Sequence, residues 1–306
     1  MSSTTVIEAP TSHKLELHTA YGPVYRDVLN TEPRDATEEE QNTEAKEQVS
    51  QDKSTYYNGW KAPRSTNISR TESVDVKESF SWRYQPENDP DHPQPLSSLP
   101  ADVQPWIRGE EFVWQGTSHL PNFKSDVLNY WKSCLQLARQ LVKVFALSLD
   151  LPEDYFDTRT TFPGADGVMN YYPITTAEET ASNADEVGGL QVLTKDGQWI
   201  KATPKPGTFV VNIGDFMMRL SNDFFKSTVH RVYNRAKVER VSMPFFFGLN
   251  FNCMEGVIPT CTSEDNPPKY EPISCGDWCQ LRFKLEAERM AKKLAEQEAT
   301  TKLIAK

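Results

Sequence analysis

The chain has 306 residues, of which 38% are hydrophobic and 25% charged, as is typical of a soluble globular protein with one large domain or two small ones. Its net charge of −10 argues against a general affinity for nucleic acid or for an anionic membrane surface. No run of residues approaches the length of an apolar membrane span, and the first residues lack the basic and apolar regions of a secretory signal.

Residues 1–54 are predicted to form a polar, acidic N-terminal segment that is partly disordered. Acidic residues dominate positions 32–53, and no apolar side chain there is larger than Val49. Such a segment buries too little apolar surface to offset the entropy that it loses on folding, so it is either a solvated helix or disordered.

Residues 55–154 are predicted to form an aromatic-rich region followed by a long scaffold helix. Up to position 114, aromatic residues alternate with prolines and polar turns, which indicates an ordered region with little regular structure. Ser125 is a suitable N-cap, and apolar residues recur after it at helical spacing until the chain approaches Pro152. This helix is expected to end at residues 149–151 and to pack its apolar face against a sheet.

Residues 155–255 are predicted to form a mainly β domain. Short strands separated by turns at intervals of about ten residues indicate a sandwich or jelly roll. The Asp196-Gly197 pair favours a hairpin turn. The expected strands are residues 190–193, 199–200, 209–213, 228–233 and 241–247. The predicted fold class is therefore α+β, mainly β, with helices on the outside.

Residues 256–306 are predicted to be a C-terminal loop and a charged helix at about 277–298. Cys275 and Cys279 lie one helical turn apart, but two thiols are too few for a structural zinc site, so we expect structural thiols rather than a metal site or a disulfide. The chain has five cysteines in all, an odd and sparse set that is typical of reduced thiols in the cytoplasm.

Candidate binding chemistry is concentrated around His230, Arg240 and Ser242. His230 is flanked by predicted strands on both sides. Arg240 and Ser242 are two positions apart, so in a strand they face the same way and present a planar cation and a hydroxyl together. This pair suits a small carboxylate. The alternative is a buried structural histidine and a surface arginine.

Longer motifs surround these residues, in an order and spacing that cover about three-quarters of the chain. They resemble the 2-oxoglutarate/Fe(II)-dependent oxygenases, in the isopenicillin N synthase-like branch and its fungal members. The segments that carry the resemblance are residues 57–60, 77–80, 170–173, 185–192, 206–215, 222–232 and 240–246.

The resemblance implies a double-stranded β-helix, or jelly roll, with Fe(II) and 2-oxoglutarate as cofactors. In that family iron is held by a His-x-Asp pair and a distal histidine, and His230 matches the distal ligand. Arg240 and Ser242 match the residues that bind the far carboxylate of 2-oxoglutarate, and Tyr172 matches their hydrogen-bond partner. The implied activity is the oxidative tailoring of a small-molecule substrate with dioxygen, by hydroxylation or desaturation, in secondary metabolism. No oligomeric state is indicated.

One segment departs from the family pattern. The interval between Tyr172 and the glycine pair at 188–189 contains no histidine, and none of the five histidines is followed two residues later by Asp or Glu. Within this interval, oxygen ligands to iron could come from Glu178, Glu179 or Asp185. The alternative is that these are solvated loop carboxylates. Because the interval is also shorter than in the family, we expect one or two strands to be missing. The alternative function is a catalytically inactive relative, or the product of a faulty gene model, that binds a carboxylate or a partner without turnover.

Overall fold

The computed structural model describes residues 43–63, 77–173, 189–232 and 239–282, with positions 284, 285 and 288. It also describes the backbone of two strands, β1 (Ser12–Thr19) and β2 (Gly22–Leu29), which pair as an antiparallel hairpin that the sequence had not led us to expect. The predicted strand deficit between 174 and 188 and the predicted end of the last helix lie outside the described residues.

A five-stranded antiparallel sheet lies at the centre of the described structure. Strand β5 (Pro163–Tyr172) pairs with β4 (Glu78–Trp82), which pairs with β3 (Gly59–Lys61). On its other edge β5 pairs with β9 (Arg240–Ser242) and β10 (Phe245–Asn250). Strands β3 and β4 come from the aromatic-rich region, so the prediction of little regular structure there is wrong for these two segments.

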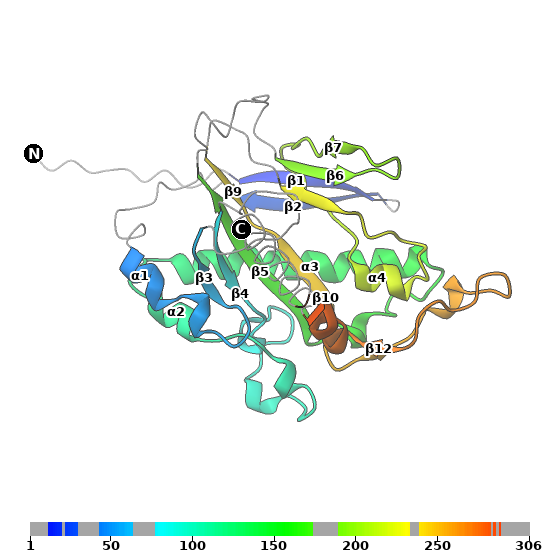
Figure 1. Ribbon diagram of the computed structural model, residues 1–306, viewed down its shortest axis with the longest axis horizontal. Coiled ribbons are helices and arrows are strands. Elements are labelled where there is room, and N and C mark those ends of the chain that lie inside the picture. Colours follow the sequence, from blue (N-terminus) through cyan, green and yellow to red (C-terminus); the bar gives the residue numbers. More distant parts are fainter. Residues whose placement is uncertain are drawn as a thin grey trace, which may run out of the picture.

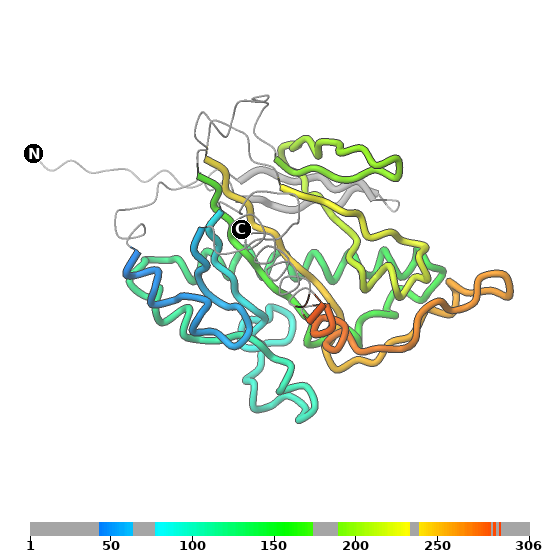
Figure 2. Tube along the Cα trace, viewed as in Figure 1, coloured from blue at the N-terminus to red at the C-terminus, as the bar shows by residue number. Residues whose placement is uncertain are grey.

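The strand that the sequence predicted at 241–247 is divided into β9 and β10. Both lie along the same edge of β5, and Figure 2 shows the gold trace of this segment running beside the green trace of β5. Pro244 separates them because its nitrogen has no hydrogen to donate to the ladder. Its carbonyl still accepts a hydrogen bond from Val168 N at 3.1 Å, so the two strands stay attached to β5 as one interrupted edge.

The long helix α3 (Phe123–Ser148) runs across one face of this sheet (Figure 1). It begins two residues before the predicted N-cap: Asn122 occupies the cap position with φ of 64°, and Ser125 Oγ donates to Asn122 O at 2.8 Å. Trp131 Nε1 donates to Ala165 O of β5 at 3.1 Å. The apolar residues of this contact form one core, which consists of Trp82, Tyr84, Val113, Trp114, Val127, Leu128, Trp131, Leu135 and Ala165. The predicted packing of this helix against a sheet is confirmed.

A second sheet contains three strands in the order β7–β6–β8. These are β6 (Leu190–Leu193), β7 (Trp199–Lys201) and β8 (His230–Val232). The predicted hairpin turn joins β6 to β7, with Gly197 at φ of 77°. The strand predicted at 209–213 does not form, because none of the described strands pairs with it, and Val210 remains 61% exposed.

The remaining described elements are short. They are α1 (Thr43–Gln48), α2 (Phe112–Gly116), α4 (Asp215–Leu220), the paired strands β11 (Met254–Glu255) and β12 (Ile273–Ser274), and 3-10 turns at Gln51–Lys53, Pro86–Asn88, Leu96–Ser98, Gln104–Trp106, Asp157–Arg159 and Pro259–Cys261. The last helix begins at Cys275, two residues before the predicted start. Within the described ranges, no helix combines the length and apolar character that crossing a membrane requires.

Candidate functional site

Four polar or aromatic side chains meet where β5 and β9 pair, and we call them the β5–β9 cluster: Asn170, Tyr172, Arg240 and Ser242. Tyr172 lies directly opposite Arg240, and Asn170 directly opposite Ser242. Directly paired residues of antiparallel strands project from the same face, as do residues two apart in one strand. The cluster therefore occupies one face of β5. It is the face turned away from α3, because the alternate residues Ala165 and Met169 pack into the core beneath that helix.

The aromatic ring of Tyr172 holds the guanidinium of Arg240. The guanidinium carbon lies 5.0 Å from the ring centroid, and the tyrosine is only 6% exposed. Stacking of this kind fixes the plane of the cation and leaves its N–H edges available for a planar acceptor. Arg240 Nη1 is buried and has no hydrogen-bond partner among the described residues. An unpartnered buried donor is costly unless a ligand satisfies it, so this arrangement fits an anionic group.

The acidic residue next to Arg240 does not neutralise it within the described contacts. Glu239 accepts a hydrogen bond from Tyr171 OH at 2.7 Å, and Tyr171 projects from the opposite face of β5. Burial and this bond to Glu239 raise the pKa of Tyr171 to about 12, so the phenol remains the donor at neutral pH. The positive charge of Arg240 is thus left available on the cluster's own face.

Asn170 is a member of the cluster that was not predicted from the sequence. Its side chain is 5% exposed, and its Nδ2 donates to Ser242 Oγ at 3.4 Å. A hydroxyl that accepts from an amide keeps its own hydrogen free to donate, so Asn170 leaves Ser242 ready to bond a carboxylate. The sequence shows only that Asn170 is two residues before Tyr172 and so shares its face of the strand; its pairing with Ser242 follows from the register between β5 and β9.

His230 is not brought to the β5–β9 cluster by any described contact. It lies in β8 of the second sheet, its side chain is exposed, and its Nδ1 is 3.2 Å from Thr228 O. The part of the chain that the structure describes contains no group of three His, Cys, Asp or Glu side chains able to hold a metal. The described surroundings of His230 therefore do not fit an iron centre. The three carboxylates considered as possible ligands, Glu178, Glu179 and Asp185, lie outside the described residues.

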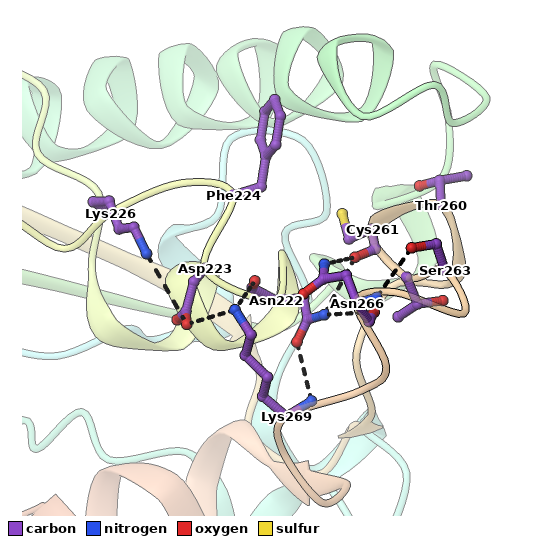
Figure 3. A pocket seen from close by; sticks show the side chains of 10 residues that line it. Asn222, Asp223, Phe224, Lys226, Thr260, Cys261, Ser263, Asn266 and Lys269 are labelled. Atoms are coloured by element: carbon purple, nitrogen blue, oxygen red, sulfur yellow. Dashed lines mark hydrogen bonds and ion pairs between the residues drawn. The ribbon is translucent and has the colours of Figure 1, made fainter.

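A surface hollow of about 430 Å³ lies away from the cluster and shares none of its residues (Figure 3). Buried Asn222 closes its floor by donating from Nδ2 to Pro267 O at 3.1 Å and accepting from Lys269 N at 3.0 Å. Lys269 Nζ bonds Asp223 Oδ2 at 3.1 Å. These contacts join the loop after α4 to residues 266–269, which explains the hollow as a junction between two loops.

Comparison with known proteins agrees with the fold. Residues 168–249 match the model of the 2OG-Fe(II) oxygenase superfamily. The chain is 37% identical over 266 residues to a 2-oxoglutarate-Fe(II) type oxidoreductase, ppzC, of Metarhizium majus, which covers 79% of this chain and 71% of that protein. It is 36% identical over 202 residues to the oxidoreductase hxnY of Emericella nidulans, with 59% of this chain and 58% of that protein covered.

Among solved structures, that of a full-length Neurospora crassa protein in complex with alpha-KG has a TM-score of 0.61 and 26% identity, over 80% of this chain and 78% of that one. Family members have a jelly-roll fold and use Fe(II) and 2-oxoglutarate, so the predicted fold class and cofactor class are confirmed at the level of the family. From the extent of these matches, the chain belongs to the 2-oxoglutarate-Fe(II) type oxidoreductases of the 2OG-Fe(II) oxygenase superfamily.

Proposed function

We propose that the β5–β9 cluster binds the far carboxylate of 2-oxoglutarate and that the chain oxidises a small-molecule substrate in fungal secondary metabolism. One observation carries this proposal: Nη1 of Arg240, beside the ring of Tyr172, is buried and has no hydrogen-bond partner among the residues that the structure describes. In the bound state Arg240 gives two parallel N–H donors to the carboxylate, and Ser242 donates its hydroxyl hydrogen. Tyr172 fixes the plane of the guanidinium.

The co-substrate supplies reducing electrons when it is bound, through oxidative decarboxylation to succinate, and dioxygen is the proposed oxidant. The described residues of this chain account for binding and orientation only.

We further propose the division of the chain at residues 54, 154 and 255, with the oxygenase domain at 155–255. All five cysteines are free thiols, which supports a reducing compartment such as the cytoplasm.

Ligand-observed NMR with 2-oxoglutarate tests the site, with succinate as a dicarboxylate comparator. We expect saturable binding to the wild type with an affinity near the millimolar range, about −4 kcal/mol. Arg240→Ala removes a buried charged partner, worth about 2–5 kcal/mol, and should abolish detectable binding. Arg240→Lys should weaken it because a point charge cannot form the planar fork. Ser242→Ala should cost about 1 kcal/mol.

Arg282→Ala is the matched control, because Arg282 pairs with Asp215 near the surface, with its side chain 49% exposed. It removes the same charge and should leave binding unchanged. Wild-type binding that Arg240→Ala does not alter would place the carboxylate site elsewhere in the chain.

The second candidate function is a non-catalytic relative that binds the dicarboxylate without turnover. Two observations favour it. None of the five histidines in the sequence is followed two residues later by Asp or Glu, and the described residues contain no group of three side chains able to hold a metal. Consumption of dioxygen and formation of succinate in the presence of Fe(II) and 2-oxoglutarate distinguish the two. Both signs of turnover together support the oxidoreductase, whereas NMR binding with neither supports the non-catalytic relative.

A further inference from the structure

Arg108 has the same two properties as Arg240, in a different part of the fold. Its guanidinium carbon lies 4.7 Å from the ring centroid of Phe251, 5.5 Å from that of Tyr56 and 5.8 Å from that of Trp106. Its Nε is buried and has no hydrogen-bond partner among the described residues. The rings fix the position of the cation, and a buried donor of this kind is costly unless a ligand accepts from it.

Arg108 lies over the same face of β5 as the β5–β9 cluster. A Cβ atom at Gly164 would lie 2.7 Å from Cζ of Phe251, so this ring, with the guanidinium beside it, covers the face to which Gly164 would project. Asp166 is two residues further along β5 and shares that face, as do the β5 members of the cluster. The charge of Arg108 reaches it: burial raises the pKa of Asp166, and the charges of Arg83 and Arg108 oppose that rise.

The positive charge of Arg108 is not cancelled by Asp166. Arg83 follows β4 directly, and its Nη1 forms an ion pair with Asp166 Oδ2 at 3.3 Å. The same side chain is fixed by a hydrogen bond from its Nε to Tyr56 O at 3.1 Å. One carboxylate therefore faces two guanidinium groups and is paired with the other one. Excess positive charge beside an unsatisfied donor favours an anionic ligand.

The two unsatisfied arginines are too far apart for one molecule of 2-oxoglutarate to bridge them. Asp166 and Tyr172 are six residues apart on β5, which is about 20 Å at the rise of an extended strand. Tyr172 holds Arg240 at one end of this span, and Phe251 holds Arg108 at the other. The four carbon–carbon bonds of 2-oxoglutarate, about 1.5 Å each, separate its carboxylates by at most about 6 Å. A ligand of Arg108 is therefore a different molecule.

Apolar surface lies on the same face between the two arginines. Phe246 of β10 pairs directly with Asp166, so it projects from that face, and it is 55% exposed. Val168, the next residue of β5 on the face, is partly exposed. A ligand whose anionic group is bound by Arg108 would lay its body over these two side chains, and the burial of apolar surface would add to binding.

We propose that Arg108 binds the carboxylate of the substrate, and that the substrate is a small carboxylic acid with an apolar or aromatic body. This inference rests on the proposed function, in which the chain oxidises a small molecule beside 2-oxoglutarate. Arg108 gives its N–H donors to the carboxylate, and Phe246 contacts the apolar body. Arg83 keeps Asp166 in an ion pair and so reduces its repulsion of the ligand. The two ligands occupy one face of β5 at the same time.

Ligand-observed NMR with phenylacetate as the probe tests the proposal on the wild-type chain, with and without an excess of 2-oxoglutarate. We expect saturable binding of phenylacetate in both cases, because the two sites are separate. The neutral analogue phenylacetamide should bind about tenfold more weakly, since it has no charge to pair with Arg108. Absence of phenylacetate binding, equal binding of the acid and the amide, or displacement of phenylacetate by 2-oxoglutarate would each overturn the proposal.

Variants assign the site to Arg108. Arg108→Met keeps an apolar stem against the aromatic rings and removes the charge, so it should weaken phenylacetate binding about tenfold and abolish the preference for the acid over the amide. Arg282→Ala, the exposed control, should change neither. Phenylacetate binding that Arg108→Met leaves unchanged, with folding confirmed by circular dichroism, would overturn the proposal. If Arg108→Met does not fold, the comparison of acid and amide on the wild type decides the question.

The same titrations separate this proposal from the proposed function. Arg108→Met should leave 2-oxoglutarate binding unchanged, and Arg240→Ala should abolish 2-oxoglutarate binding and leave phenylacetate binding unchanged. Loss of both ligands in folded Arg108→Met would overturn the assignment of two separate sites. If Arg240→Ala does not alter 2-oxoglutarate binding, the proposed 2-oxoglutarate site is wrong, while a loss of phenylacetate binding in Arg108→Met still supports the carboxylate site at Arg108.

Discussion

Asn170 and Ser242 are paired across β5 and β9, and the amide of Asn170 donates to the hydroxyl of Ser242 over 3.4 Å. Asn170 is uncharged and is not proposed to contact the ligand, whereas Ser242 is proposed to donate to its carboxylate. The geometric effect of the hydrogen bond is to turn the Ser242 hydrogen away from Asn170. We therefore assign Asn170 as a positioning residue for the β5–β9 cluster.

The first prediction is that Asn170 and Ser242 are energetically coupled in ligand binding. Asn170→Ala and Ser242→Ala should each weaken 2-oxoglutarate binding by about 1 kcal/mol, the value of one hydrogen bond. The double variant should lose about as much as either single variant, since both act on the same contact. A double-mutant cycle by NMR titration measures this coupling. Asn129→Ala, at an exposed position of α3, is the control and should change nothing. Fully additive losses would show that Asn170 acts separately from Ser242.

The second prediction concerns a buried ion pair that holds the segment after β4 against α3. Arg139 Nη2 and Nη1 bond the two carboxylate oxygens of Asp89 at 2.7 and 2.8 Å, and the aspartate side chain is fully buried. Asp89→Asn removes the buried carboxylate and leaves Arg139 only the more exposed Asp91, at 2.7 Å, so it should lower the free energy of unfolding by about 3 kcal/mol, the lower end for a broken buried pair. The exposed pair Lys124–Glu111 is the control, and Glu111→Gln should cost at most about 1 kcal/mol. Urea unfolding compares the two variants, and equal losses would contradict the prediction.

The third prediction is an acid-dependent loss of stability from the same carboxylate. Burial alone would raise the pKa of Asp89, but the hydrogen bonds and charge of Arg139 outweigh burial and lower it below its ordinary value. A lowered pKa in the folded state means that the stabilisation is complete above the unfolded value of about 3.9 and disappears as the pH falls through the folded value. Wild type should therefore lose more stability below about pH 4 than Asp89→Asn does. Thermal unfolding of both proteins, measured from neutral pH to below about pH 4, tests this prediction. Midpoint temperatures that fall in parallel with pH would contradict it.

The sequence predicted elements best where one local pattern was strong. The helical spacing of apolar residues located α3 to within three residues at its N- and C-terminal ends, and the Asp196-Gly197 pair located the β6–β7 turn. The 209–213 segment was misleading because its Phe-Val-Val run has strand propensity, while strand formation depends on a pairing partner that local sequence does not specify. Strands β3 and β4 were missed for the converse reason: β5, which anchors β4 and through it β3, lies far away in the chain.

The candidate site was predicted in part. The two-residue spacing of Arg240 and Ser242 indicated their common face, and the structure places Tyr172 opposite Arg240. Asn170 was missed because its role depends on the register between β5 and β9, which a single strand does not reveal. The role of His230 as an iron ligand, which the family resemblance implies, stays a prediction. The described residues offer no group of three ligands that includes it.

The last prediction tests the packing of β5 onto the α3 core. A Cβ atom at Gly167 would lie 2.2 Å from Cζ2 of Trp82, a side chain that is 1% exposed in the centre of that core. Neither the strand nor the indole has room to move, because interiors are close-packed, so Gly167→Ala should destabilise the protein by about 1–3 kcal/mol. At Gly256 the nearest atom would be Pro272 Cγ at 3.5 Å, an ordinary contact, and Gly256→Ala should be close to neutral. Urea titration followed by tryptophan fluorescence measures both midpoints. Equal shifts for the two variants would mean that the β5–Trp82 contact is looser than its geometry indicates.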